Sequence, residues 1–512
     1  MKQTKSFLEK HGIHTFLLPV FAVLHSYRQY FGLVSTDVTV KILGELVLFF
    51  LIFFLVALAI TKSRNKSFQL TTLFGFVYLF YGLIKDFFQL TLHVSFLSRY
   101  SVLLPALTVA VIALSRAILK KKDFRTANLF QNAVLIIFIF IDVIGIMASN
   151  NSLLLQRNLL AKNSYRQVDK LPSTASKPNV YYIVLDCYPG TCYLKDYMQY
   201  DNSSFGQALE EKGFRVLRNP RSNYNWTAFS ISSTLNFEYL QKLKNCSPVG
   251  SMDYSQAILT TKESIVPKIF KQNGYAIHNL SIFDIGGISP VLKENFLTLP
   301  ERDVLLYNTL SERLKRDLLW NFTKGKYVVP FIKKMEKRKK DKLMMAQAKK
   351  RDFNNIVIDS LMKISCRESN CPQFVYTHVL LPHPPFFYDE NGSENELNAI
   401  LTEKSQKNKS LFLSYLKYTN KEALKMVDNI MRASGGNSLI ILQSDHGFRD
   451  FEGGPTHPDV FFQNFSAFYF PDKNYGCLYD NMSNINTFPI IFNKCFGMNI
   501  PLQQDSSIFL IN

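Results

Sequence analysis

Long apolar stretches occupy the first 150 residues of the chain, and they constrain its fold more than any other feature. Each approaches the roughly 20 residues that an α-helix needs to cross a bilayer. No signal-peptide cleavage pattern follows the first and weakest stretch, so we expect it to be retained. The sequence therefore predicts a transmembrane domain of about five spans over residues 1–150, at 14–33, 41–61, 68–92, 101–119 and 127–148.

Basic residues in the connections predict the orientation of these spans. Lys and Arg gather before the first segment, between the second and third, and between the fourth and fifth, whereas the other two connections carry little charge. Basic loops stay cytoplasmic, so we expect a cytoplasmic N-terminus. An odd number of spans then places everything after residue 150 outside. Together with the Lys-, Asn- and Phe-rich composition, this predicts a multi-pass protein of the bacterial inner membrane with a periplasmic or extracytoplasmic C-terminal domain.

Four ionisable residues fall within or near the ends of the spans, namely Glu45, Lys85, Asp86 and Asp142. Ionisable groups at such depths are costly and often functional. Lys85 and Asp86 could line an entry for lipid headgroups. The alternative is that all four are interfacial residues whose charged ends extend toward water.

The whole chain is basic, with a formal net charge of +19. Nothing in it resembles a nucleic-acid-binding module, so we expect no nucleic acid partner and interpret the charge as favouring anionic membrane surfaces or acidic substrates. All seven cysteines follow residue 186, which would suit disulfides in an exported domain, although free thiols are the alternative. The candidate pairs are Cys366 with Cys371, Cys187 with Cys192, and Cys477 with Cys495.

Residues 151–178 are polar and predict a linker or an interfacial helix, and a catalytic domain follows at residues 179–512. Helical stretches and apolar strand candidates alternate through this domain, which is typical of an α/β fold with a mostly parallel sheet. The strand candidates are 180–185, 214–217, 275–280, 374–379, 438–443 and 465–470, and the helical stretches are 203–212, 228–240, 262–273, 303–320, 331–364 and 404–434.

Two of the apolar runs end on acidic residues. Residues 439–442 lead into Asp445-His446-Gly447, and the run before Asp186 has the same form. Ligands of parallel sheets lie at the carboxyl ends of the strands. Asp186, Asp445 and His446 therefore make a candidate metal site of oxygen and imidazole ligands, and Gly447 lets the backbone turn behind them.

A candidate nucleophile lies where an Asn-rich loop passes into a predicted helix. Thr227 occupies this junction, and a helix N-terminus suits a phosphate or sulfate group. A hydroxyl there can be activated by a metal. The simpler interpretation is that Thr227 only caps the helix. Thr191, five residues after Asp186, is a second candidate nucleophile.

Other candidate site residues lie in loops near strand ends. His383 follows the strand at 374–379 in a proline-stiffened loop, where an imidazole could donate to a phosphoryl oxygen or protonate a leaving group. His457 is a similar candidate after Asp445-His446. Arg449 and Asn223 are candidates for binding substrate oxyanions.

Taken together, these motifs resemble the alkaline phosphatase/sulfatase superfamily. They are Val-Leu-Asp186 after a first strand, Thr227 at a loop-to-helix junction, the His383-Pro-Pro loop, and Ser-Asp445-His446-Gly late in the chain. Within it, the chain is most similar to the membrane-anchored, sulfatase-like branch with lipoteichoic acid synthases and lipid A phosphoethanolamine transferases, including its five-span N-terminal part. The resemblance implies an alkaline-phosphatase-like α/β/α domain.

The resemblance also implies roles for individual residues. Asp186, Thr227, Asp445 and His446 would bind one divalent metal ion, with zinc or manganese favoured and magnesium or calcium possible. Thr227 would attack phosphorus and carry a covalent intermediate. His383 and His457 would contact the transferred group.

Three departures from the family pattern limit which activity, metal sites and close relatives the resemblance implies. The segment around Thr227 lacks the C/S-x-P-x-R motif of sulfatases, which disfavours sulfate-ester hydrolysis. Val379 stands where two-metal members place an Asp, which puts a complete second metal site in doubt. The early ligand is Asp186, where the teichoic acid and phosphoethanolamine enzymes use Glu.

The sequence therefore predicts a membrane-anchored, metal-dependent phosphotransferase. It would move a phospholipid headgroup, phosphoglycerol or phosphoethanolamine, through a Thr intermediate to an envelope glycan or lipid. The alternative on the same site is a phosphodiesterase or sulfuric ester hydrolase. An inactive membrane scaffold that binds glycans is the third hypothesis.

Overall fold

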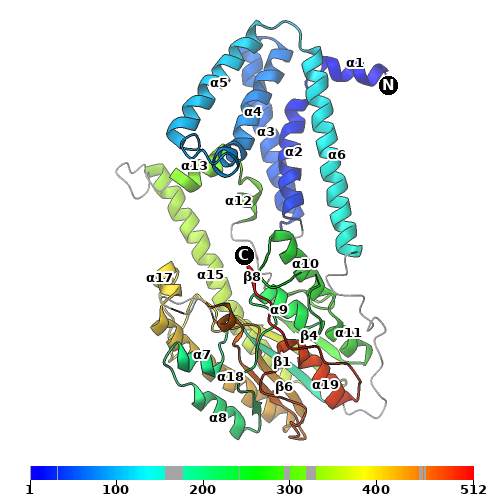
Figure 1. Cartoon of the computed structure of the whole chain (residues 1–512), viewed down its shortest axis with the longest axis vertical. Coiled ribbons are helices and arrows are strands. Elements are labelled where there is room, and N and C mark those ends of the chain that lie inside the picture. The colour runs from blue at the N-terminus through cyan, green and yellow to red at the C-terminus, as the bar shows by residue number, and fades with distance from the viewer. Residues whose placement is uncertain are drawn as a thin grey trace. The chain divides into compact units, whose positions relative to one another are not determined.

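The structure is a computed structural model, and the chain in it divides into two compact units (Figure 1). Unit 1 comprises Met1–Leu154 and Asn295–Arg338, and unit 2 comprises Leu155–Glu294 and Lys339–Asn512. Residues 300–318, which the sequence analysis includes in the C-terminal domain, thus group with the apolar helices. The described residues are 2–31, 33–155, 177–241, 243–292, 300–318, 330–448, 454 and 457–511.

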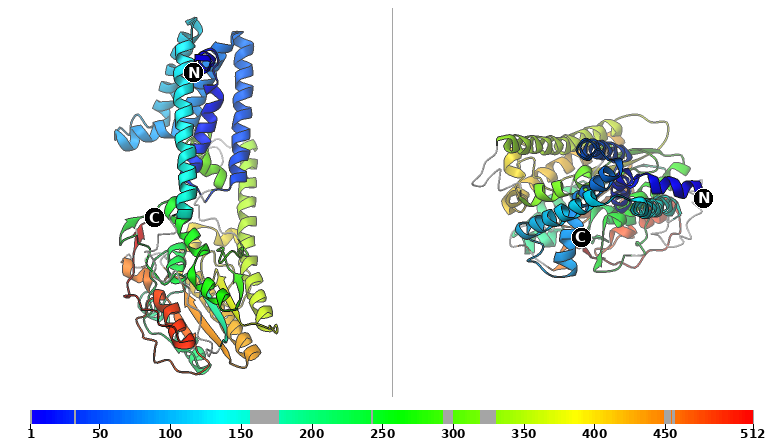
Figure 2. Two further views of the ribbon diagram at one scale, coloured as in Figure 1. Left: turned by 90° about the vertical axis from the view of Figure 1, so that its right-hand side faces the viewer. Right: turned by 90° about the horizontal axis from the view of Figure 1, so that it is seen from above.

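Unit 1 is built from helices that follow the apolar stretches. Helices α2, α3, α4 and α6 run side by side in it (Figure 1 and Figure 2). Ser35 begins α3 by accepting a hydrogen bond from the backbone of Val38, and Lys62 ends it in a left-handed conformation. The helices are α1 (Lys2–Lys10), α2 (His14–Gln29), α3 (Thr36–Thr61), α4 (Arg64–Asp86), the π-helix η1 (Phe87–Thr91), α5 (Tyr100–Lys120) and α6 (Arg125–Leu155).

The predicted count of five spans is corrected to four among the described residues. Four helices are long and apolar enough to cross a membrane, at Thr36–Thr61, Arg64–Thr91, Tyr100–Lys120 and Arg125–Ala148. Helix α2 covers most of the first predicted segment, but it has only 16 residues and contains Pro19. That is shorter than the roughly 20 residues of a span. The odd-number argument for the orientation therefore loses its basis.

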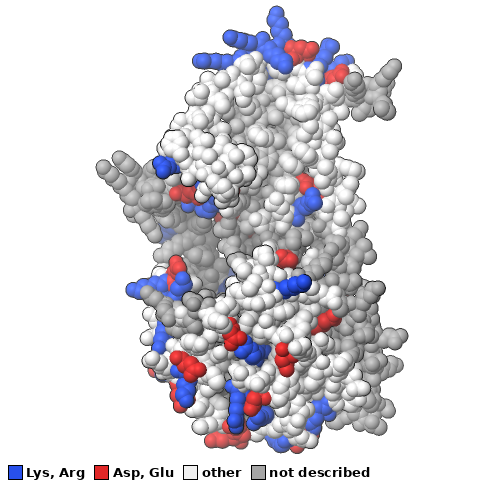
Figure 3. Space-filling view, in the orientation of Figure 1, with Lys and Arg blue, Asp and Glu red and all other residues white. Residues whose placement is uncertain are grey.

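The outer faces of these helices are apolar. Large hydrophobic side chains such as Ile60, Val109 and Phe130 are 77%, 67% and 69% exposed, which suits contact with lipid rather than water. Figure 3 shows Lys and Arg gathered at the end of unit 1 at the top of the view, and few charges along its sides. The predicted membrane anchor is consistent with this distribution.

Residues 300–318 fold against the apolar helices of unit 1. They form α12 (Glu301–Leu305) and α13 (Leu310–Leu318), where the sequence predicted one helix over 303–320. The backbone N–H of Gly82 in α4 donates to the carbonyl of Asn308 at 2.8 Å. The connection between the helices thus lies directly on α4. Val304, Leu305 and Leu306 join the apolar core of the unit with Leu18, Val23, Ile42, Leu46, Phe50, Leu79 and others.

Each of the four ionisable residues noted in or near the spans has a charged partner. Asp142 lies 3.1 Å from Arg28 and 3.3 Å from His25. The other three pair with residues 300–318: Glu45 with Arg302, Lys85 with Asp317, and Asp86 with Arg313. The charged partners of all four residues are therefore other side chains of unit 1.

Unit 2 contains a six-stranded sheet with the strand order β2-β7-β6-β1-β5-β4. All six strands fall on the six predicted runs. Strands β6, β1, β5 and β4 are mutually parallel, and β7 runs antiparallel to β6 and β2. The predicted α/β class with a mostly parallel sheet is confirmed. The strands are β1 (Asn179–Leu185), β2 (Arg215–Val216), β4 (Ala276–Leu280), β5 (Gln373–Val379), β6 (Ser438–Ser444) and β7 (Ser466–Tyr469).

Helices flank these strands along the chain. Two short strands, β3 (Ser247–Pro248) and β8 (Leu510–Ile511), form a separate pair. The helices are α7 (Thr191–Asp196), α8 (Ser203–Glu211), α9 (Thr227–Thr234), α10 (Ser251–Lys262), α11 (Ile265–Gln272), α15 (Pro330–Ser365), α16 (Leu397–Ile400), α17 (Glu403–Gln406), α18 (Lys409–Ser434) and α19 (Thr487–Phe496), with 3-10 turns η3 (Pro458–Phe462) and η4 (Asn484–Asn486).

The register of the three central strands aligns their carboxyl ends. Leu185 of β1 pairs with Ser444 of β6 on one side and with Val379 of β5 on the other. All three strands are fully buried over these last residues, as expected for a parallel sheet. The residues that follow them therefore meet at one edge of the sheet.

Candidate metal centre

Asp186 and Asp445 lie beside each other at this edge. Both carboxylates are buried, at 3% and 0% exposure. One oxygen of Asp445, Oδ1, accepts hydrogen bonds from the backbone N–H groups of Cys187 at 3.1 Å and His446 at 2.9 Å. The strand ends thus fix the position of Asp445 through its first oxygen and leave its second oxygen, Oδ2, directed at its neighbours.

His446 joins the two carboxylates to the candidate nucleophile. Its Nδ1 lies 2.9 Å from the carbonyl of Gly447, which assigns the ring proton to Nδ1 and the lone pair to Nε2. That Nε2 is 3.4 Å from Asp445 Oδ2, 3.9 Å from Asp186 Oδ1 and 3.1 Å from the hydroxyl of Thr227. The structure therefore brings Asp186, Thr227, Asp445 and His446 together, as the motifs predicted.

Thr227 is the first residue of α9, and Trp226 occupies the capping position before it. Thr227 is therefore not the helix cap, which was the simpler interpretation of this residue. It is partly exposed, whereas the carboxylates and His446 are buried. Ser230, one turn further along α9, has its hydroxyl 2.6 Å from the carbonyl of Asp445 and ties the helix to the sheet edge.

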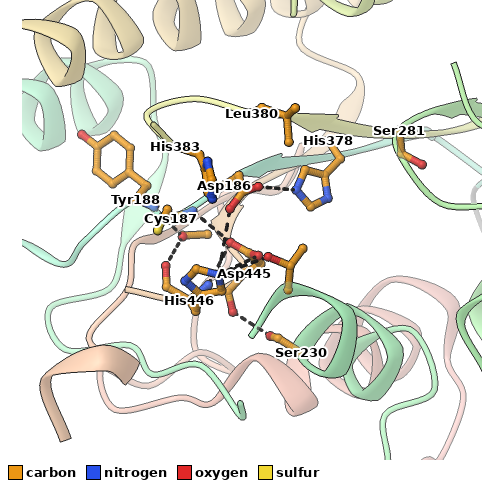
Figure 4. Close-up of polar contacts among 12 residues, drawn as sticks. Asp186, Cys187, Tyr188, Ser230, Ser281, His378, Leu380, His383, Asp445 and His446 are labelled. Atoms are coloured by element: carbon orange, nitrogen blue, oxygen red, sulfur yellow. Dashed lines mark hydrogen bonds and ion pairs between the residues drawn. The ribbon is translucent and has the colours of Figure 1, made fainter. Parts of the chain in front are cut away.

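His378 belongs to the same group, although the sequence analysis did not select it. It lies within β5, one residue before the strand ends, and is fully buried. Its Nε2 is 3.6 Å from Asp186 Oδ2. Figure 4 shows the side chains of Asp186, Asp445, His446 and His378 gathered in one place. The signal in the sequence is a histidine inside an apolar strand whose neighbouring strand ends on an acidic residue.

Several atoms of this group are suited to a metal ion. Among the described residues, Asp186 Oδ1, Asp445 Oδ2 and His378 Nε2 are buried and have no hydrogen-bond partner. Buried polar atoms without partners are costly, so their convergence needs an explanation. Asp186, His378 and Asp445 offer ligand atoms within 4.8 Å of one another, and so do Asp186, Cys187 and His446. Carboxylate and imidazole donors fit a divalent transition metal such as zinc or manganese.

The imidazoles also control the charge of Asp186. Burial raises the pKa of the Asp186 carboxyl, but its neighbours His383, His378 and His446 stabilise the ionised form by more than burial opposes it. The pKa of Asp186 therefore lies below its usual range. The carboxylate is ionised at neutral pH, as a metal ligand must be.

His383 lies close to the group but is only partly buried. Its loop contains two cis peptide bonds, Leu381–Pro382 and Pro384–Pro385, and its Nδ1 is 2.6 Å from the carbonyl of Pro384. Figure 4 shows the ring above Asp186. His383 and Thr227 are thus partly exposed, whereas the side chains of Asp186, Asp445, His446 and His378 are buried.

The other predicted substrate-binding residues differ in their surroundings. Asn223 is fully buried, and its Oδ1 is 2.9 Å from the hydroxyl of Ser230, so it supports α9 from behind. His457 is exposed and accepts a hydrogen bond from the backbone of Asp459 at the start of η3. Arg449 lies outside the described residues. Thr191 begins the six-residue helix α7.

Gly447 is needed for close packing rather than for its backbone angles. A Cβ atom at this position would lie 2.5 Å from the carbonyl oxygen of Gln463 and 3.0 Å from that of Phe461. Its N–H donates to Phe461 at 2.9 Å. The glycine therefore lets the segment after His446 press against residues 460–463. As for the cysteines, all seven have free thiols in the structure.

The chain matches no protein-family profile and no curated protein. Similar solved structures include the zinc complex of the C-terminal periplasmic domain of EcEptC from Escherichia coli, at 11% identity and a TM-score of 0.39, covering 67% of this chain and 93% of that one. A protein of the alkaline phosphatase superfamily from Vibrio parahaemolyticus has 13% identity and a TM-score of 0.36, over 68% and 75% of the two chains. The phosphonate monoester hydrolase of Agrobacterium radiobacter has 12% identity and a TM-score of 0.36, over 62% and 74%.

Proposed function

We propose that this protein is a membrane-anchored, metal-dependent phosphotransferase of the sulfatase-like type. It would transfer a phospholipid headgroup, phosphoglycerol or phosphoethanolamine, through Thr227 to a hydroxyl of an envelope glycan or lipid. The observation that carries the proposal is the hydroxyl of Thr227, 3.1 Å from His446 Nε2, next to buried carboxylates that have unpaired oxygens.

The residues present define what each would do. Asp186, Asp445 and His446 would hold a divalent ion, which supplies positive charge to the phosphoryl oxygens and favours deprotonation of Thr227. Thr227 Oγ1 forms a bond to phosphorus as the bond from phosphorus to the diacylglycerol oxygen breaks. His383 would donate a proton to that leaving oxygen. The acceptor hydroxyl would then attack phosphorus and pass its proton to His383 as the bond from phosphorus to Thr227 Oγ1 breaks.

The location of the α9 N-terminus supports a phosphoryl substrate. Thr227 is the first residue of an eight-residue helix, so the positive end of the helix dipole lies at the reacting hydroxyl. This arrangement suits an anionic group in the ground state and the added charge of the transition state.

The orientation in the membrane follows from α6 alone. Lys121 and Lys122 lie in the connection before α6, Lys120 ends α5 and Arg125 begins α6, and basic connections stay cytoplasmic. Because α6 crosses once, its other end emerges on the opposite side, whether or not α2 also spans. We therefore place unit 2 in the periplasm or outside the cell, where lipid donors and envelope acceptors are both present.

The test is to trap the covalent intermediate. Full-length protein in detergent is loaded with Zn²⁺ or Mn²⁺ and incubated with phosphatidylglycerol or phosphatidylethanolamine, and its intact mass is measured. We expect an added phosphoglycerol or phosphoethanolamine that is absent from Thr227→Ala. Turnover in this variant should fall by about 10³-fold or more.

Thr191→Ala is the matched control, since it removes the other candidate hydroxyl and should keep both adduct and turnover. Comparing products with and without a glycan acceptor separates transfer from hydrolysis on the same site. Wild-type turnover in Thr227→Ala would refute the proposed nucleophile.

A further inference from the structure

We propose that His378 is a metal ligand, binding through its Nε2 on the Oδ2 side of Asp186. No sequence motif assigned this residue, and it lies one position before Val379, where the family pattern has an Asp in two-metal members. The inference rests on the proposed metal dependence, but it concerns metal affinity rather than group transfer.

The first support is the position of the ring. His378 is fully buried, and its Nε2 is 3.6 Å from Asp186 Oδ2, too far for a good hydrogen bond. In the part of the chain that the structure describes, this nitrogen has no hydrogen-bond partner. Its ligand atom lies within 4.8 Å of those of Asp186 and Asp445. A buried imidazole nitrogen and two buried carboxylates thus offer ligand atoms close enough to share one ion.

The second support is the orientation of the ring. Its other nitrogen, Nδ1, is 3.1 Å from the hydroxyl of Tyr376, two residues earlier on the same face of β5. Metal-binding histidines usually hold their second nitrogen in such a hydrogen bond, which fixes the tautomer and the direction of the lone pair. With the proton on Nδ1, the lone pair of Nε2 faces the two carboxylates.

The alternative is a histidine that only fills the core, and unit 1 contains an example of one. His14 is also fully buried, but both of its ring nitrogens have partners. Its Nδ1 is 2.8 Å from Thr72 Oγ1, and its Nε2 is 3.4 Å from Asn128 Oδ1 and 3.3 Å from Gln69 Nε2. A structural histidine is therefore satisfied on both sides, whereas His378 is satisfied only on the side away from the carboxylates.

The Asp186 carboxylate then lies between two imidazoles, with one oxygen facing each. Asp186 Oδ1 faces His446 Nε2 at 3.9 Å, and Asp186 Oδ2 faces His378 Nε2 at 3.6 Å. His378 thus supplies a nitrogen donor on the Oδ2 side of Asp186. Two imidazoles with carboxylates favour zinc or manganese over magnesium or calcium.

The experiment measures metal binding by the full-length protein in detergent, without substrate. Zn²⁺ affinity is obtained by competition with a chromophoric chelator, and the visible spectrum of bound Co²⁺ reports the ligand set. We expect His378→Ala to weaken Zn²⁺ binding by at least about 100-fold and to change the Co²⁺ spectrum, and Tyr376→Phe to weaken binding by about tenfold.

The matched control is His278→Ala, because His278 lies on the neighbouring strand β4 and outside the ligand group. It should bind Zn²⁺ as the wild type does. Without metal, His378→Ala should melt at a lower temperature than the wild type, because a cavity replaces the buried ring and the contact with Tyr376 is lost. The ligand role is tested by the metal-induced rise in melting temperature, which should shrink in this variant. If His378→Ala does not fold, His378→Gln, which fills more of the space, takes its place.

The outcomes separate this inference from the proposed function. Wild-type Zn²⁺ affinity and an unchanged Co²⁺ spectrum in a folded His378 variant would overturn the inference, and so would a wild-type protein that binds no metal. Loss of affinity in the His378 variants together with full turnover in Thr227→Ala would support the ligand role while refuting the transfer mechanism.

Discussion

Asp142 in unit 1 and Asp186 in unit 2 are both almost fully buried, but their surroundings differ. Asp142 has Arg28 at 3.1 Å and His25 at 3.3 Å. Asp186 Oδ1 has no hydrogen-bond partner within the described ranges, and a second unpaired carboxylate oxygen, on Asp445, lies close to it. A buried charge with a cation beside it is stabilised by the fold itself. Buried carboxylates that lie close together without a neighbouring Lys or Arg need a bound cation.

The same contrast holds for the surrounding elements. In unit 1, Asp86 and Glu45 receive Arg313 and Arg302 from a distant part of the chain. At the sheet edge of unit 2, three strands bring two carboxylates and two imidazoles together. Among the described residues, the ion pairs at this edge join these groups to one another and include no Lys or Arg. Unit 1 thus uses ion pairs to hold segments in place, whereas the sheet edge of unit 2 gathers carboxylates and imidazoles.

The largest effect is expected from neutralising a carboxylate at the sheet edge. Asp445→Asn keeps an oxygen that can accept the hydrogen bonds from Cys187 and His446 but removes the negative charge. We expect turnover and Zn²⁺ affinity to fall by at least about 100-fold, because a ligand of the ion is lost. Without metal, the melting temperature should equal or exceed that of the wild type, since an unpaired buried charge is gone.

The measurements are chelator competition, turnover, and thermal unfolding with and without Zn²⁺. A clear loss of stability in the metal-free variant would mean that Asp445 is paired in solution, and the contrast between the two units would fail at its main point.

The second effect concerns an ion pair of unit 1. Arg313→Ala removes a guanidinium that is 5% exposed and leaves Asp86, 30% exposed, without its partner. It also removes the stacking of Arg313 on the ring of Tyr307, 4.6 Å away. We expect the free energy of unfolding to fall by about 2–4 kcal/mol, reduced from the fully buried case because Asp86 reaches solvent. Thermal unfolding in detergent would measure it.

Lys425→Ala is the matched control, since it removes a cation that is 60% exposed in its pair with Glu422. Its effect should stay under about 1 kcal/mol. Zn²⁺ affinity should not change in either variant. Equal stability of Arg313→Ala and the wild type would show that the pairing does not hold residues 300–318 in place.

The smallest effect is steric. A Cβ atom at Gly82 would lie 2.5 Å from Arg313 Nε and 2.8 Å from the Cα of Asn308. Gly82→Ala should therefore cost about 1–3 kcal/mol through overpacking. Gly44→Ala in α3, where no atom lies within 4 Å of the added carbon, should be neutral or stabilising by up to about 1 kcal/mol. Thermal unfolding of both variants gives the difference in their free energies of unfolding. Equal values would argue against close packing of residues 300–318 on α4.

Much of the fold could be predicted because it depends on local pattern. Continuous apolar runs identified all six strands of the main sheet, and the apolar segments of unit 1 became helices. The break between α12 and α13 was missed because it depends on contacts with α4. The assignment of residues 300–318 to unit 1 rests on pairs such as Arg302 with Glu45, which no local pattern reveals.

The candidate site was predictable to the extent that its residues follow strand ends. Asp186, Asp445 and His446 do so, and Thr227 begins a helix after a loop. His378 was missed because it lies inside β5 and was interpreted as part of an apolar strand. Only the register, in which His378 pairs with Val184, places it beside the residue that follows β1.

The membership of residues 300–318 in unit 1 has a consequence for dividing the molecule. The chain passes between the units three times, after residues 154, 294 and 338. A single cut therefore cannot separate unit 2 from unit 1. A fragment that starts near residue 179 would carry Val304, Leu305 and Leu306 without the helices that cover them, and such exposed apolar surface promotes aggregation. Isolating unit 2 would need three cuts and a new loop joining residue 294 to 339.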